Sequence, residues 1–138
     1  MNVSSYLFFE GQCQQALDFY RDILDIEIVE LMHYADSPEP VAENGIPPGS
    51  EGKVMHCSFR LGDSLFMASD GMCSGKADLN GFAISLAVDD VQQAQRLFDA
   101  LGRDGEILMP LDKTFFAERF GMVKDRFGMS WMIHAAAH

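Results

Sequence analysis

A chain of 138 residues with 48% hydrophobic residues fits one compact domain, which buries about two thirds of the surface that the unfolded chain exposes. Its 10 basic and 21 acidic residues give a net charge of −11, and this negative field repels phosphate backbones and anionic membrane surfaces. We therefore expect no nucleic-acid partner and no membrane partner.

The lengths of the apolar runs and the number and spacing of the cysteines indicate in which cellular compartment the protein is found. No apolar run approaches the ~18 residues of a membrane helix, and residues 1–9 lack the charged start and long apolar stretch of a signal peptide. Cys13, Cys57 and Cys73 are an odd number without CxxC spacing, which argues against a disulfide framework and against a thiolate zinc site. We expect free thiols and a cytoplasmic location.

The first half begins with the strand-like run VSSYLFF, residues 3–9, followed by GQCQQALDFYRDIL, residues 11–24. In the second stretch the apolar residues recur at helical spacing, which predicts a helix with one apolar stripe. A further strand is expected in IEIVELMHY. The stretch from Asp36 to Gly52 is rich in Pro, Gly and acidic residues and is predicted to be a long mobile loop.

The second half repeats this order. FAISLAV, residues 82–88, reads as a strand, and DDVQQAQRLFDAL, residues 89–101, repeats the QQA of the first helix. Asp90 is a good N-cap and Gly102 a good stop for this helix. A strand is expected in EILMP. The loop sequence LDKTFFAERFG carries two adjacent aromatic residues, which need a surface to pack on and could line a pocket.

Each half ends in a similar strand, turn and strand. MHCSFRLGDSLFMASD and FGMVKDRFGMSWMIHA both have a turn with glycine, Gly62 or Gly128, and a serine at the same step, Ser64 or Ser130. Such a module cannot cover its own apolar face, so two modules should occur together. We predict an α+β fold of two βαβββ modules in tandem, with curved mixed sheets and the helices outside. We expect residues 1–138 to form a single domain, with module 1 at about 1–70 and module 2 at about 80–138.

This pattern resembles the vicinal oxygen chelate superfamily, which includes glyoxalase I, extradiol dioxygenases and the fosfomycin and bleomycin resistance proteins. YLFFEGQCQQALDFYRDIL, VMHCSFRLGDSLFMASDG and AERFGMVKDRFGMSWMI look most like its PhnB-like branch. The resemblance implies the fold and a homodimer. It also implies a cup formed by the sheets, in which enzymes of the superfamily hold a divalent metal through His, Gln or Glu.

The metal positions implied by the resemblance carry poor ligands in this chain. They fall on Ser5, on Phe66 or Met67, on Ala83 and on Met132. A divalent metal needs several strong nitrogen or oxygen ligands. We therefore predict no cofactor and an apolar cup, with a divalent metal left as an alternative, and expect the protein to purify without stoichiometric Zn, Ni, Mn or Fe.

Strand alternation selects the candidate site residues. In KVMHCSFRL it separates Met55, Cys57, Phe59 and Leu61 from Val54, His56, Ser58 and Arg60, and the second set could face the cup. His56 is the candidate catalytic residue, because it is polar, lies in mid-strand and titrates near physiological pH. The predicted ligand-binding residues are Ser5, His56, Ser58, Ser85, Phe116, Arg119 and Met132.

Other polar residues give weaker alternatives. His33 could form a site with Glu30, and Arg119, Lys124 and Arg126 could hold an anion or be ordinary solvated charges. The remaining candidates are the C-terminal histidines His134 and His138, and Trp131, which is expected in the core.

These observations lead to rival functions. The first is a cytoplasmic homodimer that binds a small organic molecule, similar to the bleomycin-resistance type in lacking the metal set. The alternative is a divalent-metal-dependent lyase, isomerase or dioxygenase with a rearranged ligand set that includes His56, and a third class uses His56 as a general base without metal. The PhnB resemblance suggests phosphonate metabolism, and related proteins carry a demethylubiquinone methyltransferase label, but the sequence has no cofactor-binding glycine motif.

Overall fold

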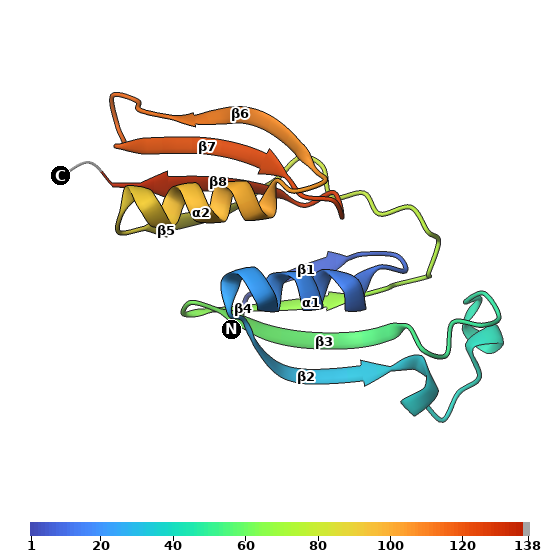
Figure 1. Cartoon of the computed structure of the whole chain (residues 1–138). Helices are drawn as coiled ribbons and strands as arrows, with labels where there is room; N and C mark the ends of the chain where they lie inside the picture. Colours follow the sequence, from blue (N-terminus) through green and yellow to red (C-terminus); the bar gives the residue numbers. More distant parts are fainter. Residues whose placement is uncertain (137–138) are drawn as a thin grey trace. The chain divides into compact units, whose positions relative to one another are not determined.

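The computed structural model describes residues 1–136. The chain divides into two compact units, Met1–Asp78 and a second that begins at Leu79, and each contains one α-helix and one four-stranded sheet (Figure 1). The first unit consists of β1 (Ser5–Phe8), α1 (Cys13–Leu24), β2 (Glu27–His33), β3 (Val54–Leu61) and β4 (Ser64–Ser69). The second consists of β5 (Ile84–Val88), α2 (Val91–Leu101), β6 (Glu106–Asp112), β7 (Arg119–Lys124) and β8 (Ser130–Ala135).

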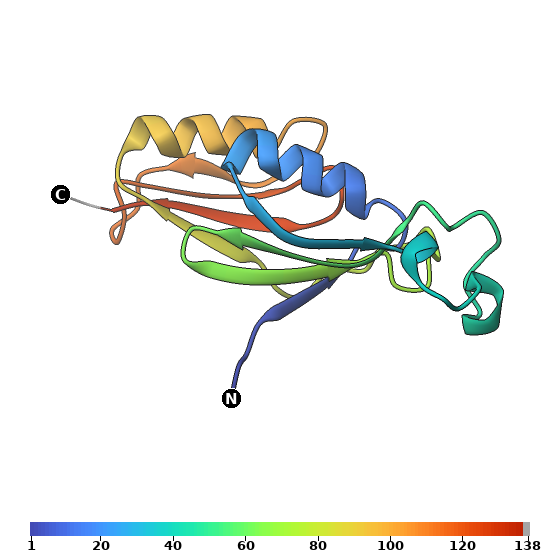
Figure 2. The same ribbon diagram turned by 90° about the horizontal axis from the view of Figure 1, so that it is seen from below.

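The two units have the same topology. Their sheets have the orders β1-β4-β3-β2 and β5-β8-β7-β6, in which the first two strands are parallel and the others antiparallel. Each helix lies on one face of its own sheet (Figure 2). The predicted tandem βαβββ modules are therefore confirmed.

A shared irregularity shows how closely the two units correspond. The register of edge strand β2 shifts between Ile28 and Glu30, and that of edge strand β6 shifts between Ile107 and Met109. Each shift inserts one extra residue, Val29 or Leu108, and such β-bulges turn the following side chains to the other face. The duplication thus includes the bulge as well as the strand order.

A buried carboxylate holds the first unit together. Gln12 precedes α1 but makes no side-chain cap. Asp70, which is 1% exposed, instead accepts hydrogen bonds from the backbone N–H groups of Gly11 and Cys13 through Oδ1 and from that of Val54 through Oδ2, each at 2.8 Å. The residue after β4 therefore caps α1 and fixes the start of β3.

The second unit uses a different carboxylate. Asp125, 3% exposed, accepts hydrogen bonds from the N–H groups of Phe127 and Met129 and from Nε1 of Trp131. These bonds organise a turn over residues 125–129, whereas the first-unit turn comprises residues 62–63. Trp131 is 1% exposed, which confirms its expected place in the core.

The longer turn corrects one sequence equivalence. Ser64 and Ser130 occupy the same step in the sequence, but Ser130 shares a face with Met132, while Ser64 shares one with Phe66. Phe66 lies on the helix-covered face and Met132 on the opposite face. The two serines are therefore not structurally equivalent.

Helix α2 begins and ends as predicted. The Asp90 side chain accepts a hydrogen bond of 2.6 Å from the N–H of Gln93, and Gly102 is the C-cap. The helix packs closely on β7, because a Cβ at Gly121 would lie 2.8 Å from Cε2 of Phe98. In residues 1–136, no helix is both long and apolar enough to cross a membrane.

The loop predicted to be mobile has local structure. The 3-10 helix Tyr34–Asp36 leads into it, and it contains the 3-10 helix Val41–Asn44 and buries Val41, Ile46 and Ser50. The loop is anchored by the buried side chains of Val41 and Ile46. Because most of its other residues are prolines, glycines and acidic residues, composition alone predicted a mobile loop.

We predict that Asp70→Asn lowers the free energy of unfolding by about 3 kcal/mol, because it puts an amide nitrogen against buried N–H donors and removes charge-assisted hydrogen bonds. Denaturant unfolding measures the change. Asp63→Asn, at the exposed hairpin turn, is the matched control and should change stability by less than about 0.5 kcal/mol. Equal effects of the two substitutions would show that the Asp70 network is not needed.

Candidate functional site

Strand β3 presents different residues to the two faces of the first sheet. Cys57 is fully buried, and its Sγ lies 4.0 Å from that of Cys13 on α1, so Cys57 points toward the helix. His56 and Ser58, its neighbours along the strand, point to the opposite face. We call this face, which α1 does not cover, the open face of the first sheet.

Three polar side chains meet on the open face. The Tyr6 hydroxyl lies 2.7 Å from Nδ1 of His56, and Oε2 of Glu30 lies 3.8 Å from Nε2 of the same ring. They come from β1, β3 and β2, so strands that are not consecutive in the sequence build the Tyr6–His56–Glu30 cluster. The His56 side chain is 29% exposed, so it is shielded yet accessible.

The surroundings of the His56 ring indicate which group donates the hydrogen bond between Tyr6 and His56. Burial raises the pKa of Tyr6 above its ordinary value, so the phenol keeps its proton at neutral pH. The Glu30 carboxylate favours the His56 tautomer that carries its proton on Nε2. In that tautomer Tyr6 donates to Nδ1, and the cluster can pass a proton between a bound molecule and solvent.

The surroundings of the cluster are largely apolar. The Phe8 ring stacks on Tyr6 with 5.0 Å between the centroids. Tyr6 is directly paired with Met67, Met67 with Ser58, and Ser58 with Glu30, so these four residues form one row across the open face. Ser58 is 7% exposed and sits in the middle of this row.

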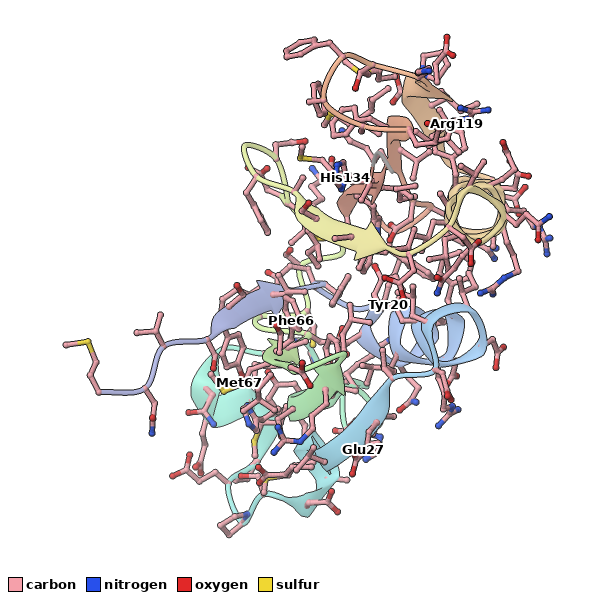
Figure 3. All side chains as sticks on the ribbon, turned by 90° about the vertical axis from the view of Figure 1, so that its left-hand side faces the viewer. Tyr20, Glu27, Phe66, Met67, Arg119 and His134 are labelled. Atoms are coloured by element: carbon pink, nitrogen blue, oxygen red, sulfur yellow. The ribbon has the colours of Figure 1, made fainter. Side chains whose placement is uncertain are left out.

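Ser5 lies apart from the cluster. It is paired with Phe66 and shares the face of Leu7, which is buried on the helix side. Ser5 and Phe66 instead line a depression of about 370 Å³ beside the β3–β4 turn. Phe66 and Met67 follow one another on β4 (Figure 3), and of the two only Met67 reaches the open face.

The second sheet brings several other candidates together. Ser85 and Met132 are directly paired on its open face, the face away from α2. Phe116 packs against Phe120 with 5.2 Å between ring centroids, and stacks on His134 at 6.4 Å. Of the two adjacent aromatic residues in this loop, Phe116 thus packs on the sheet, whereas Phe115 is fully exposed.

Arg119 lies on the other side of that sheet. It alternates with Gly121, which contacts α2, and Figure 3 shows Arg119 and His134 projecting to different sides. Its Nη1 donates to the Glu118 carbonyl oxygen at 2.7 Å. The predicted ligand-binding set is therefore divided: Arg119 does not share a face with Ser85 or Met132.

Two other basic candidates, Lys124 and Arg126, contact residues outside the sheet's open-face cluster. Arg126 lies 3.8 Å from Asp104, and Nζ of Lys124 lies 3.2 Å from Oδ1 of Asn80. Each of these two residues thus contacts a different neighbour.

His33 does not pair with Glu30. It lies 3.8 Å from Asp36 and 3.4 Å from the Gln14 side chain, while Glu30 approaches His56. Glu30 and His33 are three residues apart on β2 and therefore point to opposite faces, and the bulge at Val29 puts Glu30 on the open face. His138 lies outside the described residues.

The residues that the fold family would use for a divalent metal do not fit one. Ser5 and Phe66 face away from the cluster, Ala83 has no donor, and Met67 and Met132 offer soft thioethers. Within residues 1–136, no three His, Cys, Asp or Glu side chains gather into a possible metal site.

A nucleotide-type cofactor commonly sits on a glycine-rich connection between a strand and a helix. Here those connections are residues 9–12 and 89–90, and only Gly11 is a glycine. Neither connection fits such a cofactor.

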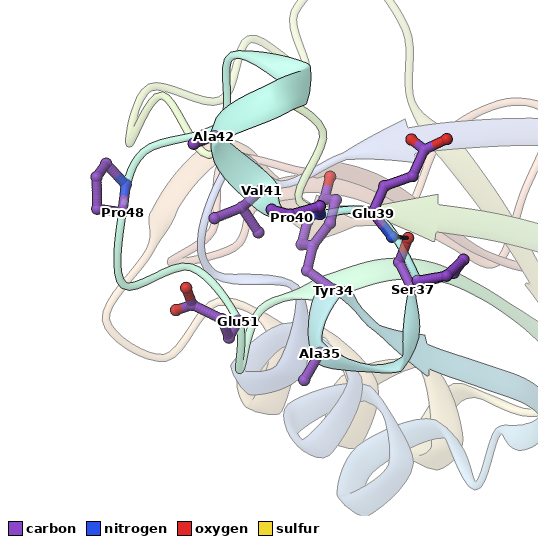
Figure 4. A pocket seen from close by; sticks show the side chains of 10 residues that line it. Tyr34, Ala35, Ser37, Glu39, Pro40, Val41, Ala42, Pro48 and Glu51 are labelled. Atoms are coloured by element: carbon purple, nitrogen blue, oxygen red, sulfur yellow. Dashed lines mark hydrogen bonds between the residues drawn. The ribbon is translucent and has the colours of Figure 1, made fainter.

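A cavity of about 440 Å³ lies in the loop that follows β2 (Figure 4). Half of its lining residues are proline or alanine, and Tyr34, Glu39 and Glu51 are among the others. Glu39 is engaged by the Asn44 amide at 3.2 Å. This cavity therefore offers fewer convergent polar groups than the Tyr6–His56–Glu30 cluster does.

Sequence reasoning missed Tyr6 and the role of Glu30. The signal for Tyr6 was present, because Leu7 and Phe9 form the buried face of β1 and Tyr6 must point the other way. Glu30 carried no comparable signal, since its direction depends on the bulge.

Comparisons with known proteins define the class first. The chain has a TM-score of 0.61 and 11% identity to a glyoxalase/bleomycin resistance protein/dioxygenase family enzyme from Burkholderia phytofirmans PsJN, covering 98% of this chain and 96% of that one. This likeness shows the glyoxalase/bleomycin resistance-like fold.

The sequence comparisons define a family within this fold. The profile of the family described as 3-demethylubiquinone-9 3-methyltransferase matches residues 1–134. The chain is 36% identical to protein YjdN of Escherichia coli K12, over 97% of this chain and 95% of the relative. It superposes on a PhnB protein from Bacillus cereus with a TM-score of 0.82 and 29% identity, covering 99% and 100% of the two chains. The chain belongs to this PhnB-like family.

The raised pKa of Tyr6 gives a prediction with a definite sign. Burial raises the pKa of Tyr6 and of Tyr34 above 10.0, so their stabilising contribution is present below that pH and is lost as the pH rises through the folded-state pKa. The free energy of unfolding should therefore fall above pH 10, and less steeply in Tyr6→Phe. Denaturant unfolding over pH 9–12 measures it; equal slopes for the variant and the parent would contradict the assignment.

Proposed function

We propose that the chain binds a small organic molecule on the open face of its first sheet, with Tyr6 and His56 as the polar contacts. The observation that carries the proposal is the 2.7 Å contact between the Tyr6 hydroxyl and His56, set among Phe8, Met67 and Ser58. Binding sites for organic ligands combine an apolar lining with a few placed polar groups. His56 and Ser58 remain ligand-binding candidates on the first sheet, and Ser85, Phe116 and Met132 remain separate candidates in the second unit.

Proton transfer is a second candidate function for the same cluster. His56 has a donor on one side and a carboxylate 3.8 Å away on the other, an arrangement suited to general acid–base chemistry. The family description names methyl transfer. No step through a methyl donor or a divalent metal follows, because the residues fit neither.

We predict that His56→Ala and Tyr6→Phe each weaken binding by about fivefold, the loss of about one hydrogen bond, while leaving the fold intact. A library of small organic molecules is screened by amide correlation NMR, and the affinity of each confirmed binder is then measured for both variants. His33→Ala is the matched control, because His33 lies in the same unit but contacts Gln14 and Asp36.

Two results would count against this site. Binders whose shifts map away from Tyr6, His56 and Ser58 would place ligand binding elsewhere. If His56→Ala unfolds the protein but leaves the affinity of the folded fraction unchanged, His56 is a structural histidine.

We also propose that the chain forms a twofold-symmetric homodimer. Both edge strands expose apolar side chains, Val29 on β2 and Ile107, Leu108 and Met109 on β6, at 42% to 59% exposure. Exposed apolar edge strands tend to pair with another chain.

Light scattering at micromolar concentration should give twice the chain mass of 15.4 kDa. We expect Leu108→Lys, at the β6 bulge, to shift the population toward monomer, because it places a charge on an apolar edge. Asp63→Lys, on an exposed turn, is the control and should leave the mass unchanged. A monomer from the parent chain would reject the dimer.

We propose a cytoplasmic location because the three cysteines are free thiols. Cys13 and Cys57 are buried 4.0 Å apart and unjoined, and Cys73 is also free. The hydrogen bond to Cys57 and burial raise the pKa of Cys13, so its thiol stays protonated and unreactive. Free thiols are typical of a reducing compartment.

A further inference from the structure

Three methionines stand side by side on the second sheet. Met109 on β6 is directly paired with Met122 on β7, and Met122 with Met132 on β8. Val123 and Trp131, the next residues along β7 and β8, are buried on the α2 side. The three methionines therefore share the open face of the second sheet, and we call them the methionine row.

The row corresponds position by position to Glu30, Ser58 and Met67 on the open face of the first sheet. When the pair Phe59–Phe66 is matched to Val123–Trp131, both edge-strand bulges coincide. Met122 then replaces Ser58, and Met109 replaces Glu30. Oxygen-bearing side chains of the first unit are thus replaced by thioethers in the second.

Side chains that are directly opposite on neighbouring strands have Cβ atoms about 5 Å apart. Methionine has three rotatable bonds and a polarisable sulfur, so three adjacent thioethers can converge on one point above Met122. Thioethers are soft ligands that select Cu(I) over hard divalent cations. We propose that the methionine row binds one soft monovalent cation, Cu(I).

The neighbouring row supplies charge and a fourth ligand. Asp112, Phe120 and His134 are paired across β6, β7 and β8 and form the next row on the same face, two residues from the methionines on β7 and β8. His134 lies diagonally from Met122, about 7 Å away, which a methionine and an imidazole can span. The Asp112 carboxylate and the net charge of −11 attract a cation to this face.

The row is open to a cation from solvent. Met109 is 45% exposed, and Met122 and Met132 are half-buried. The thioethers suit a soft cation, whereas the positions inherited for a divalent metal lack strong nitrogen or oxygen ligands. It is independent of organic-ligand binding at the Tyr6–His56–Glu30 cluster.

The test is an Ag(I) titration of protein labelled with ¹³C at the methionine methyl groups, in chloride-free buffer. Cys73→Ser is the background, because the half-exposed Cys73 thiol would also bind Ag(I). The methyl signals of Met109, Met122 and Met132 should shift together and saturate at one Ag(I) per chain. The signal of Met72, a methionine of the first unit at 52% exposure, should not move.

Met122→Leu keeps the apolar volume and removes the central thioether, so it should lower Ag(I) affinity by at least about tenfold. Met109→Leu, at the exposed edge strand, is a second variant with the same expected direction, and Met72→Leu is the matched control. The parent should also retain one Cu(I) against bicinchoninate under anaerobic conditions, with sulfur neighbours in its X-ray absorption spectrum.

Independent, unsaturated shifts that include Met72 would show adventitious Ag(I) only and would overturn the proposal. Unchanged affinity in both Met122→Leu and Met109→Leu would overturn it as well, as would loss of all Cu(I) to the chelator.

Discussion

The buried Asp70 carboxylate is the contact on which the first unit depends. It receives three backbone N–H groups, two from the start of α1 and one from the start of β3, each at 2.8 Å. By holding the first residue of β3, it sets which residues of that strand alternate toward the helix. His56 reaches the open face because Val54 is fixed in this position, so the site depends on a carboxylate that never touches it.

The two units keep one topology but have different anchors. Asp125 organises a turn and the Trp131 indole, whereas Asp70 joins a helix, a strand and a loop. Both carboxylates are buried and satisfied by hydrogen bonds, which is the condition for charge in a protein interior. The faces that these anchors orient have diverged in chemistry, with acid–base groups on one sheet and thioethers on the other.

Much of the fold could be predicted from sequence because the signals are local. Helical periodicity identified α1 and α2, alternation separated Cys57 from His56, and the QQA repeat revealed the duplication. Glu30 could not be placed, since the bulge at Val29 reverses the alternation, and nothing in IEIVEL marks a bulge. Ser5 was placed by analogy with a distant family, and one residue of register changes the face.

The longer turn at residues 125–129 has a consequence for protein engineering. A graft of the Tyr6–His56–Glu30 cluster onto the second unit by sequence alignment would put side chains on the wrong face. When equivalent positions are instead identified from the strand pairing, Tyr6, His56 and Glu30 correspond to Ser85, Phe120 and Met109. Equivalent positions in the two modules should therefore be identified from the strand pairing of each sheet. The sequence alignment does not identify them, because the turn between the last two strands is longer in the second module.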